Sequence, residues 1–351
     1  MGERLKDRNA VVAGAGRGIG RAVALALAEE GANIVVCDLG GSIDGTGLDK
    51  TPADEVTREC QRLGVKAVPH YGDVADFGTA EDMIRTCVNN FGCIDILCNI
   101  AGIGSGRMIF NMSEADWDRV IAVHLKGTFN LSRHACALMR QQRYGRILNC
   151  TSHERVGAAG QANYVAAKGG IASLTYATAW EMGRYGVTCN AIAPAGQTRM
   201  ALNPTIIAHF RKMVEHGLWT QQQYEEATHL PPAEHMGAIA AFLCSDEASH
   251  INGCIFTAAG HKLACWSAEM EKVIFPRDWQ KQGGWTWEEV KRCMPSLLKD
   301  YVNPAPPDRG RLAAVDVNSK RRPPKSAKPH KAWSRALVSL EGGSNGRVTR
   351  L

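Results

Sequence analysis

The 351-residue sequence contains no hydrophobic run of the roughly 18–20 residues that a helix needs to cross a bilayer. Residues 1–8 are rich in charge and lead into a strand-like segment, so we expect no signal peptide. The twelve cysteines include no Cys-x-x-Cys pair and no Cys/His spacing typical of zinc. These absences argue against a helical membrane protein and a zinc module, and they predict reduced thiols, no metal site and a cytoplasmic protein.

Basic charge is concentrated at the C-terminal end. The formal net charge is +6, but residues 304–351 alone hold 11 Lys/Arg and 3 Asp/Glu. The remainder sums to −2, so the body of the chain shows no charge footprint for nucleic acid. Six of the fourteen prolines and few apolar residues also fall in 304–351, which predicts a disordered tail.

Two short segments of this tail leave alternatives open. The run from Lys320 to Lys325 is compatible with binding RNA, an anionic membrane or an acidic protein, and equally with a functionless extension. The last residues, Thr349–Leu351, loosely match a peroxisomal Ser-Lys-Leu address, but threonine is a poor first residue for it.

Seven short apolar runs alternate with helix-like segments. They lie at 10–13, 34–37, 67–68, 94–97, 147–149, 187–192 and 254–257. Between the first two runs, Ile19, Val23 and Leu27 recur every four residues, as on one helix face. The alternation predicts an α/β fold, a Rossmann-type doubly wound parallel sheet of seven strands with helices on both faces.

We expect three regions along the chain. The α/β domain spans 1–262, with a loop inserted from Gly40 to Pro52 after the second strand. A C-terminal extension over 263–303 packs on this domain, and the tail over 304–351 follows. The extension is rich in tryptophan, with Trp266, Trp279, Trp285 and Trp287.

A glycine-rich turn, residues 14–20, joins the first strand to the first helix. Glycines there permit a tight turn and close approach of the backbone to a pyrophosphate at the helix N-terminus. Asp38 ends the second strand about twenty residues later, where a carboxylate binds ribose hydroxyls and repels the extra phosphate of NADP. The pattern favours NAD over NADP, with Arg17 as the opposing signal. The candidate cofactor-binding residues of this part are Gly14, Arg17, Gly18, Ile19, Gly20 and Asp38.

Tyr164 and Lys168 lie four residues apart in a segment of helical character. This spacing places both side chains on one helix face. A phenol with a pKa near 10 is a poor base at neutral pH. A neighbouring ammonium stabilises the phenolate, so the pair suits general acid/base catalysis.

These motifs and several others occur in the order found in short-chain dehydrogenases/reductases, which residues 5–261 resemble. The further matches are Asp73-Val74, Asn99-Ile100-Ala101-Gly102, Ser152 and Pro194 with Thr198. Within the family, the chain looks most like the (3R)-hydroxyacyl-CoA dehydrogenase unit of peroxisomal multifunctional enzymes and its bacterial relatives. The narrower likeness rests on the segments 38–41, 123–129, 160–164 and 190–194 and on the Trp-rich extension.

The resemblance implies a role for each matched residue. Tyr164 would be the acid/base, Lys168 would lower its pKa and hold the nicotinamide ribose, and Ser152 would bind the substrate oxygen. Asp73 and Val74 would flank the adenine. Asn99, Ala101 and Thr198 would complete the cofactor cleft. The implied activity is NAD-dependent interconversion of a secondary alcohol and a ketone by a homodimer or homotetramer.

Three positions depart from the family pattern. Ala13 stands where threonine usually braces the glycine turn. His124 stands where many members have the asparagine of a catalytic tetrad, either as a permissive replacement or as a change in proton relay. The loop before Tyr164 is one residue short, so both Thr151 and Ser152 qualify as the catalytic hydroxyl. We favour Ser152, because the preceding strand fixes its position and a loop absorbs a deletion more easily.

The segment from Arg199 to Pro232 corresponds to the family's substrate lid. Its apolar residues either bind a hydrophobic substrate, such as a 3-hydroxyacyl thioester, a steroid or a terpenoid, or only pack the lid helices. They are Leu202, Ile206, Ile207, Phe210, Met213, Leu218 and Trp219. The alternative function is a catalytically silent NAD-binding protein. Enoyl reduction is disfavoured by the Tyr164/Lys168 spacing.

Overall fold

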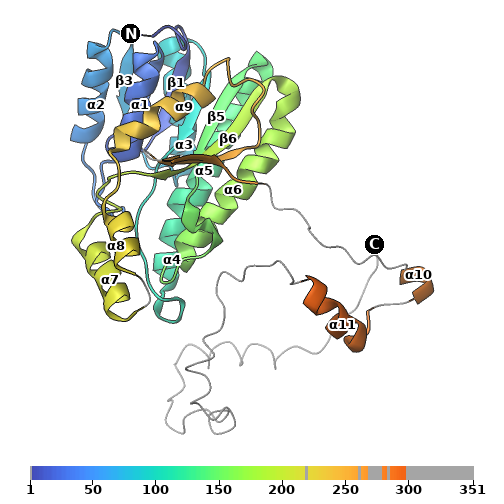
Figure 1. Ribbon diagram of the computed structural model, residues 1–351. Coiled ribbons are helices and arrows are strands. Elements are labelled where there is room, and N and C mark those ends of the chain that lie inside the picture. Colours follow the sequence, from blue (N-terminus) through green and yellow to red (C-terminus); the bar gives the residue numbers. More distant parts are fainter. Residues whose placement is uncertain (1, 218–219, 260–261, 268–278, 283–284, 298–351) are drawn as a thin grey trace, which may run out of the picture. The chain divides into compact units, whose positions relative to one another are not determined.

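An eight-stranded sheet forms the centre of the computed structural model, which describes residues 2–217, 220–259, 262–267, 279–282 and 285–297 (Figure 1). The strand order is β3-β2-β1-β4-β5-β6-β7-β8. All neighbours pair in parallel except β7 and β8, which are antiparallel. The strands are β1 Asn9–Ala13, β2 Asn33–Cys37, β3 Ala67–His70, β4 Ile96–Asn99, β5 Gly145–Cys150, β6 Val187–Ala195, β7 Ile255–Ala259 and β8 Lys262–Cys265.

The predicted doubly wound parallel sheet is confirmed, and the predicted count of seven strands is one short. The missed strand, β8, is a four-residue edge strand with mostly exposed side chains. It contains no β-branched residue and begins with a lysine, so it lacks the apolar run by which the buried strands are recognised.

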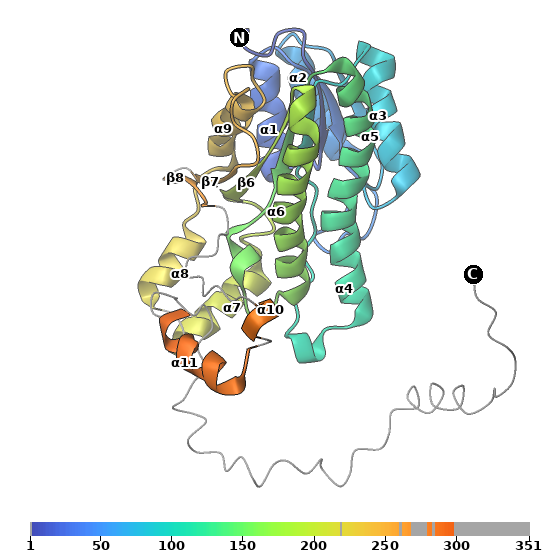
Figure 2. The same cartoon turned by 90° about the vertical axis from the view of Figure 1, so that its right-hand side faces the viewer.

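Helices cover both faces of the sheet (Figures 1 and 2). One layer contains α1 Gly18–Glu29, α2 Thr51–Arg62 and α9 Gly237–Leu243. The other contains α3 Phe77–Phe91, α5 Gly127–Gln142 and α6 Ala162–Met182. Further helices are α4 Glu114–Val120, a π-helical turn Ile121–Lys126, α7 Pro204–Glu215, α8 Gln221–Thr228, α10 Trp279–Gln282 and α11 Trp287–Leu297. Short 3₁₀ turns span Ile109–Asn111, His153–Val156, Gly183–Tyr185 and Ala233–Met236.

The core follows from the alternation of side chains along each strand. In β1, Ala10 and Val12 point into the layer of α1 and α9, whereas Val11 and Ala13 point into the layer of α3 and α5. All of them are fully buried. A strand that is covered on both faces must be apolar at every position, which explains why its sequence is a continuous apolar run.

The inserted loop ends slightly earlier than predicted. Helix α2 begins at Thr51, so Pro52 lies in its first turn. Backbone N–H groups in a first turn have no partner within the helix, so proline, which lacks this group, costs no hydrogen bond there. Within the loop, the carbonyl of Ile43 accepts a hydrogen bond from Gly104 N–H at 2.8 Å. The insertion is thereby tied to the segment that follows β4.

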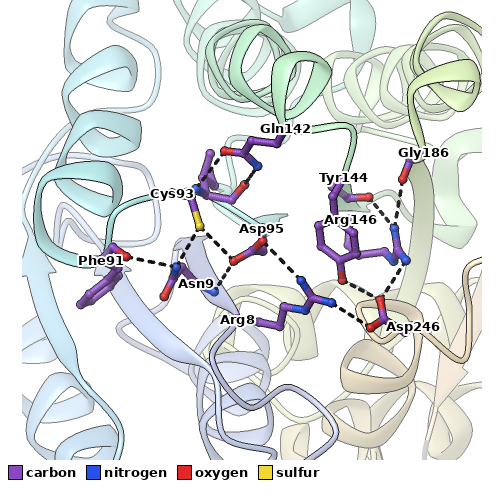
Figure 3. A network of polar contacts seen from close by, with 12 residues as sticks. Arg8, Asn9, Phe91, Cys93, Asp95, Gln142, Tyr144, Arg146, Gly186 and Asp246 are labelled. Carbon is purple, nitrogen blue, oxygen red and sulfur yellow. Dashed lines mark hydrogen bonds and ion pairs between the residues drawn. The ribbon is translucent and has the colours of Figure 1, made fainter.

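A polar network closes the edge of the sheet at which the strands begin (Figure 3). Arg8 precedes β1, Asp95 precedes β4 and Arg146 lies in β5. Both guanidinium groups stack on the Tyr144 ring, with their Cζ atoms 4.0 Å and 4.4 Å from its centroid. Asp246 pairs with Arg8 at 2.8 Å and with Arg146 at 3.2 Å. These groups join three strands to the loop after α9.

Two further predictions concern the C-terminal part of the chain, of which the structure describes only some residues. The tail predicted over 304–351 lies outside the described residues, as does a part of the predicted extension over 263–303. The domain boundaries stay a prediction. Across the described ranges, no helix combines the length and hydrophobicity of a membrane span.

Candidate active site

The predicted site residues gather at the edge of the sheet where the parallel strands end. The glycine turn follows β1, Asp38 follows β2, Asn99 ends β4 and Ser152 follows β5. Thr198 follows β6, at the start of the segment that carries α7 and α8. Figures 1 and 2 show these two helices beyond this end of the sheet. Ligands of doubly wound sheets bind in the crevice at the carboxyl ends of the strands.

The turn after β1 tolerates only glycine at several positions. Gly14 has φ +80° and Gly18 has φ +53°, both in the left-handed region. A Cβ on Gly14 would lie 2.6 Å from Ala101 Cα, and one on Gly20 would overlap the Gly14 carbonyl oxygen. Ile19 anchors the start of α1 on the core. No side chain of these glycines covers the backbone N–H groups at this helix N-terminus, so a pyrophosphate can approach them closely.

Asp38 is held against the turn by its own carboxylate. One oxygen accepts the Gly16 N–H and the other accepts the Gly40 N–H, both at 2.7 Å. A carboxylate has about four lone-pair sites, so ribose hydroxyls can still bind. The opposing signal, Arg17, donates to the Gly40 carbonyl at 3.3 Å and pairs with Asp49 at 3.4 Å. Its guanidinium is thus already engaged by the inserted loop.

Three of the predicted cofactor residues line one narrow cavity, which has no room for a water molecule. They are Val74, Asn99 and Ala101, and Ala13 joins them from β1. Asp73 does not line this cavity, and its carboxylate accepts the Ala75 N–H at 2.9 Å.

The Asn99 side chain is engaged within the protein core. Its amide nitrogen donates to Asn149 Oδ1 at 2.8 Å and contacts Ser132 Oγ at 3.2 Å. Its Oδ1 has no hydrogen-bond partner among the residues that the structure describes. Asn149 in turn donates to Thr175 Oγ1 at 2.9 Å. This amide chain joins β4, β5 and α6, so Asn99 braces the wall of the site.

Tyr164 and Lys168 share one face of α6, as their spacing predicted. Lys168 Nζ lies 5.5 Å from the Tyr164 ring centroid and donates to the Cys150 carbonyl at 2.6 Å. Burial lowers the pKa of Lys168. Burial also raises the pKa of the Tyr164 phenol, Cys150 and Glu154 raise it further, and a hydrogen bond with Ser152 lowers it. In the protein alone the phenol is therefore held in its protonated form.

The two candidate hydroxyls have different surroundings. Thr151 is buried, and its hydroxyl donates to the Lys168 carbonyl at 2.8 Å. Ser152 Oγ accepts the Glu154 N–H at 3.1 Å and hydrogen-bonds to Tyr164. Because Ser152 Oγ accepts a hydrogen bond from the Glu154 amide, the Ser152 hydroxyl hydrogen is still free to be donated to Tyr164 or to a substrate oxygen.

His124 lies in the π-helical turn and is buried. Its Nε2 is 3.0 Å from the Ile103 nitrogen and 2.8 Å from the Ile103 carbonyl oxygen. The ring meets Tyr164 edge-on with centroids 5.3 Å apart. Burial lowers the pKa of His124 to about 3, and the positive charge of Lys168 acts in the same direction. The imidazole is therefore neutral at physiological pH. The main-chain carbonyl of His124 accepts a hydrogen bond from the Thr128 hydroxyl at 2.7 Å.

Two residues of the site were missed by sequence reasoning. Glu154 lies near Tyr164 and Lys168, and burial raises the pKa of its carboxyl. Asn163 is fully buried, and its amide donates to the Ser105 and Asp116 carbonyls at 2.7 Å and 2.9 Å. Asn163 thus joins the start of α6 to the loop after β4 and to α4. Neither residue has a spacing signal of its own, although Glu154 follows Ser152 by two positions.

The predicted lid begins on the cofactor side of the site. Thr198 approaches the glycine turn so closely that a Cβ on Gly18 would lie 3.1 Å from the Thr198 methyl group. These two residues and Arg199 line one pocket. The described apolar lid residues are half-buried; Leu218 and Trp219 lie outside the described residues. The half-buried set is Leu202, Ile206, Ile207, Phe210 and Met213.

Comparison with known proteins agrees with this architecture. A family model described as enoyl-(acyl carrier protein) reductase matches residues 14–260. A hydroxyacyl-CoA dehydrogenase of Mycobacterium tuberculosis is 35% identical over 324 residues, which are 89% of this chain and 94% of that protein. The peroxisomal multifunctional enzyme type 2 of Mus musculus is 43% identical over 198 residues, which are 56% of this chain and 26% of that enzyme.

A solved structure has the same fold. A short chain dehydrogenase from Mycobacterium avium superposes with a TM-score of 0.70 at 38% identity, covering 86% of this chain and 98% of that chain. The glycine turn, the Tyr164/Lys168 pair and the strand order are therefore set in a known fold. The chain belongs to the short-chain dehydrogenase/reductase family.

Proposed function

We propose that this oxidoreductase interconverts a secondary alcohol and a ketone on a hydrophobic acyl substrate, with NAD as the hydride carrier. The observation that supports this most directly is the grouping of Ser152, Tyr164 and Lys168 at the carboxyl end of β5. The serine hydroxyl bonds to the phenol, and the buried ammonium lies beside the phenol ring. This grouping can hold a substrate oxygen and move its proton.

The choice of NAD rests on the surroundings of Asp38. Its carboxylate faces the backbone of the glycine turn, where a 2′-phosphate would meet its negative charge. Arg17, which could have offset that charge, is paired with Asp49. We therefore expect Asp38→Ala to weaken NAD⁺ binding and to raise the relative use of NADP⁺.

The chemistry divides between cofactor and protein. The bound dinucleotide would exchange a hydride with the substrate carbon at its nicotinamide ring, which is positively charged when oxidised. In alcohol oxidation, the Tyr164 oxygen takes the hydroxyl proton while Ser152 holds the substrate oxygen. The Lys168 ammonium favours the phenolate that this step requires. Because burial raises the pKa of Tyr164, oxidation should accelerate with rising pH and ketone reduction should not.

A 3-hydroxyacyl thioester is the substrate class that we favour. The half-buried apolar side chains of the lid supply a hydrophobic surface. The hydroxyacyl-CoA dehydrogenase relative, which spans nearly the whole chain, acts on a substrate of this kind by its name. A hydroxysteroid or a terpenoid alcohol would use the same surface, and these two classes serve as the comparison.

The test is NAD⁺ and NADP⁺ reduction with a panel of 3-hydroxyacyl thioesters, hydroxysteroids and cyclic terpene alcohols. Turnover with NAD⁺ that disappears in Tyr164→Phe would support the proposal and rank the substrates. If NADH binds but no substrate reacts, the chain is a silent NAD-binding protein, which is the alternative function.

A further inference from the structure

The turn His153–Val156, which follows the catalytic strand β5, presents alternate residues to two different sides. Ser152 and Glu154 face Tyr164, whose pKa responds to both of them. His153 and Arg155 instead contact Trp266, which follows β8. The turn therefore lies between the catalytic tyrosine and the first residues of the Trp-rich extension.

Trp266 is fixed by its main chain and by its indole. Its backbone N–H donates to the Ile255 carbonyl at 2.8 Å, which sets it against β7. Its indole N–H donates to Thr257 Oγ1 at 3.1 Å. The ring packs with a buried apolar cluster that contains Ala172 of α6 and Ile255. Trp266 thus docks on the same helix that carries Tyr164.

The indole reaches the turn through two kinds of contact. His153 Nε2 lies 3.0 Å from the same Thr257 hydroxyl, so this hydroxyl bridges the imidazole and the indole. The His153 ring also packs on the indole with centroids 5.7 Å apart. The Arg155 guanidinium carbon lies 4.7 Å from the indole ring centre, a cation–π distance. Two residues of the turn, His153 and Arg155, are therefore held by contacts with Trp266 and Thr257.

We propose that Trp266 is a positioning residue, which holds the turn so that the Ser152 hydroxyl meets Tyr164 and the substrate oxygen. This inference rests on the proposed function for the role of Ser152. Thr257 and His153 transmit the contact by hydrogen bonds, and Arg155 adds its stacking. Trp266 on this view supports the catalytic site through the turn, without itself contacting Tyr164 or the substrate oxygen.

The pH dependence of the reaction should report this positioning. Loss of the Ser152 hydrogen bond removes a contact that lowers the pKa of Tyr164. The midpoint of the rise in kcat/KM for alcohol oxidation should then move to higher pH. The other titratable groups near Tyr164 are Lys168, His124, Cys150 and Glu154. His153 and Arg155 contact Trp266, and the charge of Lys262 also acts on His153.

The experiment compares Trp266→Ala and Trp266→Phe with Trp287→Ala in the full-length protein. Trp287 also belongs to the extension and is 80% exposed, which makes it a matched control. We expect Trp266→Ala to lower kcat by about ten- to a hundred-fold, as a small misplacement of a catalytic group does. NADH affinity should change little and the pH midpoint should rise. Trp266→Phe, which keeps the stacking, should recover part of kcat, and Trp287→Ala should match the wild type.

Amide hydrogen exchange of the segment 151–157 provides a readout that does not depend on turnover. The Glu154 amide, which bonds to Ser152 Oγ, should exchange faster in Trp266→Ala than in the wild type. Thr257→Val, which removes only the bridging hydroxyl, repeats the test if Trp266→Ala fails to fold. Unchanged kcat, pH midpoint and exchange would overturn the inference. A wild type that turns over no substrate would refute the proposed function, and the exchange result would still decide the positioning.

Discussion

At the scale of single residues, the strand that ends before the site decides which hydroxyl faces the reaction. Successive side chains of extended backbone point to opposite sides. Thr151 therefore turns inward to the Lys168 carbonyl, and Ser152 turns toward Tyr164. Sequence spacing left both residues open, because the loop before Tyr164 is shortened. The backbone direction that separates them is a three-dimensional property and is not encoded in the spacing.

The first prediction ranks these two hydroxyls. Ser152→Ala should lower kcat by roughly 100-fold or more, as removal of a hydrogen-bond donor to a reacting oxygen does. Thr151→Ala should retain most of the turnover. It should lower the free energy of unfolding by about 1 kcal/mol, because a buried hydrogen bond is lost. Steady-state kinetics and urea unfolding of both variants measure these effects, and the reverse ranking of kcat would refute the assignment to Ser152.

The second prediction concerns His124 and stability. Its pKa of about 3 in the folded protein lies below the ordinary value of 6.5, so between these values the unfolded chain binds more protons. Stability is then fully present above about pH 6.5 and is lost as the pH falls toward 3. For this residue alone the loss between about pH 7.5 and pH 5 is about 2 kcal/mol.

His124→Asn separates this contribution from all other titrating groups. The variant carries the residue that many family members have at this position and does not titrate. Its free energy of unfolding should fall less between the same two pH values than that of the wild type, as urea denaturation will show. If His124 is a permissive replacement, the variant should also keep kcat within about three-fold; a loss beyond roughly ten-fold would indicate a role in proton relay.

At the scale of elements, the sequence predicted every strand that contains a buried apolar run and missed the exposed edge strand β8. Each of the seven predicted strands is marked by a short apolar run, which is longest where both faces of the strand are covered, as in β1 and β6. β8 has one neighbour and exposed side chains, so no such run marks it. The Trp266 contacts and the placement of Glu154 arise from segments distant in the chain, which no local pattern encodes.

The third prediction addresses the polar edge of the sheet (Figure 3). The Arg146 side chain is 4% exposed and donates to the main-chain carbonyls of Ser245, Gly145 and Gly186. Arg146→Met leaves these carbonyls without that donor, so we expect a loss of about 2–4 kcal/mol in the free energy of unfolding. Because the network lies at the opposite edge from Tyr164, kcat/KM should stay unchanged.

A matched control shows that burial causes this effect. Arg4 also pairs with a carboxylate, Glu30, at 2.7 Å, but its side chain is 64% exposed. Arg4→Met should therefore cost no more than about 1 kcal/mol, since exposed ion pairs contribute little. Chemical denaturation of both variants gives the comparison. Equal losses for Arg4→Met and Arg146→Met would contradict the argument from burial.

At the scale of the whole molecule, the outer surfaces of α5 and α6 leave large apolar side chains in contact with water. Trp180 of α6 is 88% exposed and Phe129 of α5 is 47% exposed. The two helices lie in the same layer over the sheet (Figure 2). Aromatic side chains are enriched at protein interfaces. The homodimer or homotetramer implied by the family resemblance would bury them.

The fourth prediction tests this assembly through Trp180. Trp180→Arg places a charge where an interface centred on α5 and α6 would exclude water, and a buried unpaired charge is strongly unfavourable. We expect the wild type to sediment as a dimer or tetramer and the variant to shift toward the monomer. Trp287→Arg, a change at another exposed tryptophan, should leave the assembly intact, since α11 does not belong to this pair of helices. A wild type that is monomeric at micromolar concentration would contradict the assembly, and a variant that remains fully associated would place the interface elsewhere.

Association through α6 should also affect turnover, because this helix carries Tyr164 and Lys168. An interface on its outer surface would hold the catalytic helix in place, so kcat should fall with dilution over the range in which the assembly dissociates.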